Sequence, residues 1–89
     1  MTFRVEWLQS ARDDLARIWA RADFMERQAI TAASALLDQK LQNDPDDQGE
    51  SRPDGLRIVF EPPLGVLVRT ERVGSVVLVI RVRHFRRKQ

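Results

Sequence analysis

The longest apolar run of the chain lies near its C-terminal end and reads Val76-Val77-Leu78-Val79-Ile80, followed by Arg81-Val82. Successive side chains of a strand point to opposite faces, so a strand over residues 75–82 would carry apolar groups on both sides. We therefore expect a central strand of a sheet, or a strand with one face covered by a partner. The run is far too short to span a bilayer.

Two further strands are expected just before this run, over residues 56–61 and 64–71. Pro62-Pro63 separates them, and Val73-Gly74 marks the turn into the last strand. These short connections predict an antiparallel meander. Near the N-terminus, Phe3, Val5 and Trp7 alternate with polar residues, which is the period of a half-buried strand.

Two helices are expected between the first strand and the meander. Ser10 is the expected N-cap of the first helix, in which Asp13 and Arg17 are spaced for an ion pair. Asp23 followed by Glu26 is a capping signature for the second helix, which runs to about Asn43. The apolar stripes of the two helices are Ala11, Leu15, Ile18, Trp19 and Ala22 in the first, and Ile30, Ala33, Leu37 and Leu41 in the second.

The connection over residues 43–54 is rich in Asp, Pro and Gly, and we expect it to be a loop. The order of elements is then β-α-α-β-β-β. This order predicts an α+β fold in which a helical hairpin packs on a small, mainly antiparallel sheet. We expect residues 1–89 to form a single domain. The alanines of the second helix (Ala29, Ala32, Ala33, Ala35) would let it lie close to a neighbour.

Composition excludes several kinds of chemistry. The chain has no Cys and one His, which excludes disulfides, thiol catalysis and clustered zinc ligands, and we expect no metal and no cofactor. The N-terminus lacks the apolar segment of a signal peptide, so a cytoplasmic protein without membrane association is expected. Charge is divided unevenly: residues 1–50 carry 6 basic and 10 acidic side chains, and residues 51–89 carry 9 basic and 3 acidic ones. This asymmetry predicts a polyanion or an acidic partner for the C-terminal half, although arginines that merely solvate a sheet would give the same pattern.

Several motifs along the chain, in their order and spacing, resemble the RelE/ParE superfamily of toxins from type II toxin–antitoxin systems. They are Val5-Glu6-Trp7, Ala11-Arg12-Asp13-Asp14-Leu15, Ile18-Trp19, Gly49-Glu50-Ser51-Arg52, Gly55-Leu56-Arg57, Leu64-Gly65-Val66-Leu67-Val68-Arg69 and Val79-Ile80-Arg81-Val82-Arg83-His84-Phe85-Arg86-Arg87.

The resemblance implies a toxin that a cognate antitoxin neutralises in a heteromeric complex. RelE-like members cleave mRNA on the ribosome, and ParE-like members block DNA gyrase. The RelE-like set of residues includes a Tyr near the C-terminus and an Arg on the sheet. This chain has no Tyr, and Gly65-Val66 stands where that Arg is expected. The ParE-like branch is therefore favoured. Two alternatives stay open: a ribosome-dependent endoribonuclease with a substituted active site, and a degenerate, non-toxic binding module.

The candidate functional residues gather in the C-terminal half. If the chain is a nuclease, His84 is the candidate acid or base, because histidine titrates near neutrality, and the cations for the phosphate are Arg57, Arg81 and Arg83. The candidates for contacts with a target or partner are Arg52, Arg57, Arg83, Phe85, Arg86 and Arg87. Each also has an ordinary explanation, as a solvated side chain or as an arginine that orders a nearby loop. Trp7 and Trp19 are expected in the core.

Overall fold

The computed structural model of the chain describes residues 2–85. In chain order its main elements are β1 (Arg4–Trp7), α1 (Gln9–Arg21), α2 (Phe24–Asn43), β2 (Glu50–Arg52), β3 (Leu56–Glu61), β4 (Leu64–Glu71) and β5 (Val76–His84). The predicted α+β class and the β-α-α-β-β-β order are confirmed, with the short strand β2 as an addition.

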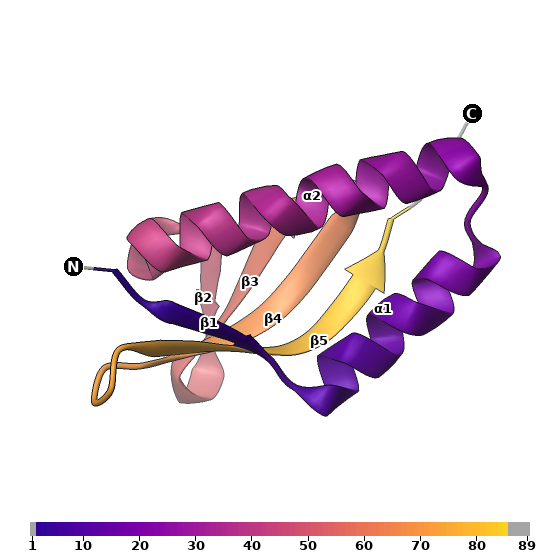
Figure 1. Cartoon of the computed structure of the whole chain (residues 1–89). Coiled ribbons are helices and arrows are strands. Elements are labelled where there is room, and N and C mark those ends of the chain that lie inside the picture. The colour runs from indigo at the N-terminus through magenta and orange to yellow at the C-terminus, as the bar shows by residue number, and fades with distance from the viewer. Residues whose placement is uncertain (1, 86–89) are drawn as a thin grey trace.

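The strands form one five-stranded sheet in the order β1-β5-β4-β3-β2. β1 runs parallel to β5, and the other neighbours are antiparallel. The last strand is therefore an interior strand, flanked by β1 and β4, which explains its apolar residues on both faces. Figure 1 shows the two helices diverging from their joint like the arms of a V, with α2 along one side of the molecule.

The core lies between the helices and one face of the sheet. α1 packs mainly on β5, and α2 packs across β1, β3 and β4. The predicted stripe of α2 is confirmed, since all four of its residues are buried. The buried cluster joins helix and sheet residues: Ala11, Ala22, Ile30, Ala33, Leu37, Leu41, Val59, Leu64, Val66, Val68, Val77, Val79 and Val82.

The two helix starts differ in how they are capped. The capping box of α2 is present: Asp23 Oδ1 accepts from the Glu26 amide at 2.8 Å, and Glu26 Oε1 accepts from the Asp23 amide at 3.0 Å. The prediction that Ser10 caps α1 is wrong, because Leu8 is the N-cap and has no side-chain bond. Ser10 lies inside the helix, and its hydroxyl bonds across to β5 instead.

The loop predicted over residues 43–54 contains β2, which the sequence pattern missed. All three residues of β2 are exposed and polar, so the strand has no apolar alternation to reveal it. Gly49 leads into it with a φ of +65°. A Cβ at Gly49 would lie 1.9 Å from the carbonyl oxygen of Ile58, so only glycine fits where this segment crosses β3.

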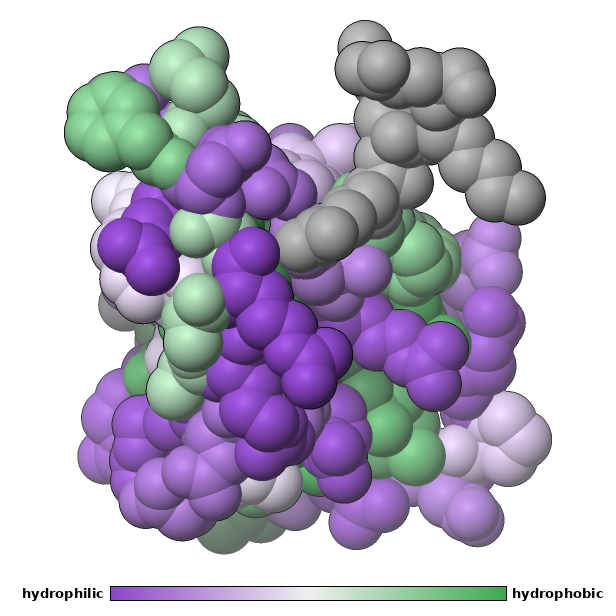
Figure 2. Space-filling model, turned by 90° about the vertical axis from the view of Figure 1, so that its right-hand side faces the viewer, coloured by the Kyte–Doolittle hydropathy of each residue, from purple (hydrophilic) through white to green (hydrophobic). Residues whose placement is uncertain are grey.

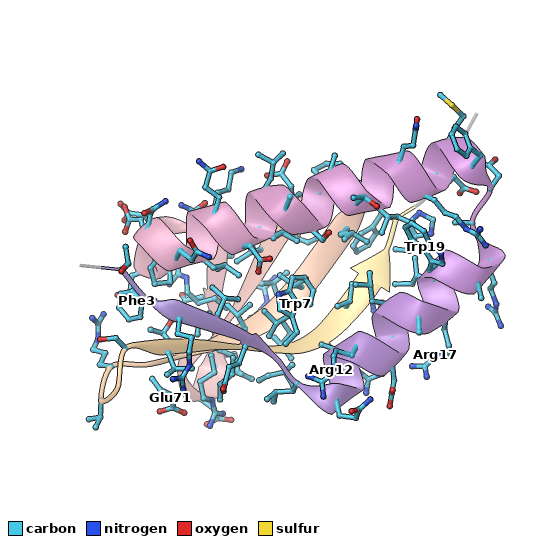
Figure 3. The ribbon with its side chains drawn as sticks, in the orientation of Figure 1. Phe3, Trp7, Arg12, Arg17, Trp19 and Glu71 are labelled. Atoms are coloured by element: carbon cyan, nitrogen blue, oxygen red, sulfur yellow. The ribbon has the colours of Figure 1, made fainter. Side chains whose placement is uncertain are left out.

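The two tryptophans have different environments (Figure 3). Trp7 packs against the core, and its indole nitrogen donates to Asp38 Oδ1 at 2.8 Å. The expectation of a core position is wrong for Trp19, which is 41% exposed. Trp19 lies at the joint between the helices, where the Arg27 guanidinium sits 5.3 Å from its ring centroid. Among residues 2–85, no helix is long and apolar enough to cross a membrane.

Candidate binding surface on the open face of the sheet

The face of the sheet away from the helices carries apolar side chains that the described elements leave partly exposed. Residues paired across neighbouring strands point to the same face, so the register assigns this face without ambiguity. Ile58 lies opposite Leu67, and Leu67 lies opposite Arg81. One position along, Val59 lies opposite Val66, and both belong to the core. The open face of β3, β4 and β5 therefore presents Leu56, Ile58, Phe60, Gly65, Leu67, Arg69, Leu78, Arg81 and Arg83.

A cleft of about 510 Å³ lies at the end of this face where β5 finishes. Its walls include Ile58 and Leu67 from the sheet, two arginines of β5, and the rings of Phe60 and Phe85. The ring centroids are 5.5 Å apart with an interplanar angle of 59°, and the two residues are 52% and 48% exposed. This tilted geometry is one that aromatic pairs favour.

Gly65 is the reason that the two rings can lie on the sheet. A Cβ at this position would be 2.7 Å from a ring carbon of Phe85 and 3.1 Å from Phe60. The rings of Phe60 and Phe85 thus occupy the space that a side chain at Gly65 would fill. From the sequence alone, Gly65 is only a departure from the RelE-like pattern, whereas in the structure it has a packing role.

Arg81 is held at the rim of the cleft by Asp14 of α1. Its Nε and Nη2 atoms donate to the two carboxylate oxygens at 2.8 and 3.0 Å. Asp14 is only 6% exposed, and it also accepts from the Val82 amide at 2.9 Å and from Arg17. The hydrogen bonds from Arg81 are the largest cause that lowers the pKa of Asp14, while burial opposes them. The carboxylate therefore stays ionised and keeps Arg81 in place.

The same contacts explain how α1 covers part of the edge of β5. β1 pairs with β5 only from Val76 to Val79, and beyond that point α1 takes its place. The Ser10 hydroxyl donates to the Ile80 carbonyl at 2.6 Å, and Asp14, one helical turn later, accepts from the Val82 amide. Side chains of a helix thus satisfy backbone groups that a neighbouring strand would otherwise satisfy.

His84 lies on the other face from Arg83, because consecutive residues of a strand alternate. β5 continues to His84, two residues further than predicted, so the histidine belongs to the strand. It is paired with Leu64 of the core face and lines a second hollow of about 580 Å³ with Arg17, Ile18 and Arg21 of α1 and with Arg83 of β5. His84 does not line the open-face cleft itself, although Arg83 borders both the cleft and the second hollow.

Arg57 and Arg52 lie at the far end of the sheet. Arg57 donates to the carbonyls of Gln48 at 2.8 Å and Gly49 at 3.3 Å, which fixes the segment before β2. Arg52 pairs with Glu50 on the surface. Arg57 is opposite Val68, whereas Arg83 is opposite Gly65. Arg57 and Arg83 are thus about 10 Å apart along the strands and two strand spacings apart across the sheet.

The structure therefore brings Arg81, Arg83 and Phe85 together at the cleft and places His84 with Arg83 at the second hollow. It leaves Arg57 and Arg52 elsewhere. Arg86 and Arg87 lie outside the described residues.

The sequence patterns did not single out Asp14 and Phe60. Asp14 could have been found as an acidic residue within the apolar stripe of Ala11, Leu15 and Ile18. The predicted ion pair between Asp13 and Arg17 is wrong, because Arg17 pairs with Asp14 and Asp13 accepts from Gln9. Within residues 2–85, no group of three His, Asp or Glu side chains could hold a metal ion.

Neither a protein-family model nor a curated protein matches the sequence. Solved structures do match its fold. The toxin–antitoxin complex RelBE2 from Mycobacterium tuberculosis contains a chain with a TM-score of 0.74 and 18% identity, over 94% of this chain and 92% of that chain. The chromosomal ParDE toxin–antitoxin system of Pseudomonas aeruginosa gives 0.73 and 17%, over 96% and 98%. TrmO from Pseudomonas aeruginosa matches with a TM-score of 0.58 and 23% identity, over 92% of this chain but 35% of that one. The fold expected from the RelE/ParE resemblance is confirmed.

Proposed function

We propose that this chain is the toxin of a type II toxin–antitoxin pair and that it inhibits growth by binding a macromolecular target, with DNA gyrase as the leading candidate. The observation that carries the proposal is the fold, which matches chains of two toxin–antitoxin systems over more than nine-tenths of both lengths. A fold alone does not specify an activity, so the choice between binding and cleavage depends on the arrangement of the side chains.

Binding is favoured over RNA cleavage because the candidate catalytic groups do not converge. Cleavage needs a base, an acid and cations around one phosphate, within hydrogen-bond reach of the reacting atoms. His84 and Arg83 border one hollow but leave β5 on opposite faces, Arg81 lines a different cleft, and Arg57 holds a loop far from all three. Arg81 is engaged by a buried carboxylate.

The open face fits a protein partner. It combines half-buried aliphatic side chains, two exposed phenylalanines and the cations of Arg81 and Arg83. A segment that bears large apolar side chains and carboxylates would cover the apolar surface and pair with the arginines. We propose that the cognate antitoxin supplies such a segment and thereby covers the face that meets the target.

Induced expression in a bacterial host tests the proposal, with growth, transcript integrity and plasmid supercoiling followed in parallel. We expect growth arrest and loss of negative supercoiling with intact transcripts. Cleaved transcripts would instead establish the nuclease, and unaffected growth would leave only the non-toxic binding module.

A pair of variants tests the surface. Leu67→Glu places a charge in the cleft and should abolish growth arrest. Val73→Glu adds the same charge at the tip of the β4–β5 turn, where Val73 is 96% exposed, and should leave growth arrest unchanged. Circular dichroism must show the wild-type spectrum for both. Equal toxicity of the two variants would contradict a role for the open face.

A further inference from the structure

Arginine side chains from two distant parts of the chain converge on the second hollow, which lies between the end of α1 and the end of β5. The walls of this hollow of about 580 Å³ include Arg17, Ile18 and Arg21 from α1, and Val82, Arg83 and His84 from β5. The three arginines are exposed, and His84 is half-buried. Figure 2 looks onto the end of the molecule where α1 finishes, and most of the surface there is strongly hydrophilic.

The hollow carries more positive charge than its carboxylate can balance. Among the described residues, three arginines and Asp14 line it, which leaves a net charge of +2 before any charge on His84. Asp14 is already occupied, because it accepts from Arg81, from Arg17 and from the Val82 amide. Within residues 2–85, the ion pairs at this hollow go to Asp14 from Arg17 and Arg81, and none includes Arg83. The Arg83 guanidinium is therefore available for a ligand.

The spacing of the α1 arginines is unfavourable for the helix itself. Arg17 and Arg21 are four residues apart, so their like charges are neighbours on one side of α1 and destabilise it. Arg21 has an ordinary explanation, because a cation in the last turn stabilises the end of a helix. It does not explain why the fold brings Arg83 to the same hollow. Such a concentration of like charge is typical of a site that attracts an ion of opposite charge.

The lining of the hollow distinguishes between the anions that could occupy it. Guanidinium groups bind phosphates and carboxylates alike, through two parallel hydrogen bonds. A protein segment, however, gains most of its affinity from large side chains that fill buried pockets. Among the described residues, the apolar part of this lining is limited to Ile18, which is half-buried, and Val82, which is buried. Contacts made by charge alone are the way in which proteins hold the backbone of a nucleic acid.

We propose that this hollow binds the phosphate groups of a nucleic-acid strand. Arg17 and Arg21 are about 6 Å apart along the axis of α1, which is similar to the separation of neighbouring phosphates, so each contacts one phosphate. Arg83 contacts the same stretch of backbone from β5. The site differs from the open face of the sheet, to which the proposed function assigns a protein partner, although Arg83 borders both.

Fluorescence anisotropy of a labelled single-stranded DNA of about 12 nucleotides tests this inference, with the full chain as titrant and salt from about 50 to about 200 mM. The dissociation constant should be about 1–100 µM at physiological salt. The logarithm of the association constant should fall linearly with the logarithm of the salt concentration, with a slope of about −2 for three phosphate contacts. Two oligonucleotides of different base sequence should bind equally, because backbone contacts carry no sequence information.

Two double variants of equal charge test the position of the site. Arg17→Gln combined with Arg21→Gln should raise the dissociation constant at least about tenfold and make the salt slope shallower by about 1.4. Arg4→Gln combined with Arg72→Gln removes the same charge at exposed positions, and Arg4 is paired with Val76 at the opposite end of β5. This control should change the dissociation constant by less than about threefold. Arg83→Gln is a further test if the first double variant changes the circular dichroism spectrum, and it should make the slope shallower by about 0.7.

Several outcomes would overturn the inference. Equal weakening by the two double variants would mean that a basic protein attracts DNA without a defined site. Polyglutamate of the same charge that displaces the DNA equally well would assign the hollow to an acidic protein segment. Inorganic phosphate that displaces the DNA at micromolar concentration would assign it to a small phosphate ligand. None of these outcomes bears on the proposed toxicity, because growth arrest is not measured.

Discussion

Replacing Asp14 with Ala would remove the contact that ties α1 to the free edge of β5. The carboxylate accepts hydrogen bonds from Arg81, from Arg17 and from the backbone amide of Val82, and the residue is 6% exposed. A single substitution therefore leaves three donors without their acceptor.

The three losses differ in size. The Val82 amide bonds Asp14 in a buried position, and leaving such an amide unpaired costs about 1–3 kcal/mol. The side chains of Arg81 and Arg17 are 60% and 62% exposed, so their guanidinium groups regain water and add little. We expect Asp14→Ala to lower the free energy of unfolding by about 2–3 kcal/mol, which is less than the loss of one partner of a fully buried ion pair. For a domain of this size, the midpoint of thermal unfolding should fall by roughly 10–20 °C.

Urea unfolding followed by circular dichroism measures this effect, with Asp13→Ala as the matched control. Asp13 precedes Asp14 on α1, and within residues 2–85 its side chain accepts a single, exposed bond from Gln9, so its loss should change the free energy by less than about 0.5 kcal/mol. If the two variants unfold at the same urea concentration, Asp14 does not hold α1 against the edge of β5.

Three further predictions concern pH and the glycines. Because the folded state lowers the pKa of Asp14, its contribution to stability is complete above the ordinary carboxyl pKa of about 4 and disappears as the pH falls through the lowered value. The difference in stability between wild type and Asp14→Ala, measured by urea unfolding, should therefore be constant from about pH 5 upwards and shrink below about pH 4. Gly49→Ala should cost about 2–4 kcal/mol, because its Cβ would collide with the Ile58 carbonyl, whereas Gly55→Ala has a similar positive φ, meets nothing within 4 Å, and should cost about 1–2 kcal/mol. Equal losses on urea unfolding would mean that the collision is relieved. Gly65→Ala should displace the ring of Phe85 and change the ring-current shifts of the Phe60–Phe85 pair in NMR spectra while the fold is kept, and unchanged shifts would contradict the close packing at Gly65.

Much of the fold follows from local patterns of residues. The alternation in residues 3–7, the apolar run after Ser75 and the stripe of α2 each predict an element, because burial on one face imposes the period of that element on the sequence. The capping box at Asp23 is equally local, since the two residues that bond each other are three apart. β2 was missed for the same reason, because an exposed polar strand has no apolar period to detect.

The candidate surface depends on contacts that no local pattern contains. Asp14 and Arg81 are 67 residues apart in the chain and meet only because α1 lies along the edge of β5. The register of β4 against β5, which shifts between Leu67 and Val68, decides which residues share a face, and a shift of one residue would have exchanged the two faces. The sequence thus predicted that function lies in the basic, apolar C-terminal half. Tertiary pairing placed Arg81, Arg83 and Phe85 on the open face and turned His84 away from it, because the direction of a strand side chain is set by pairing across the sheet.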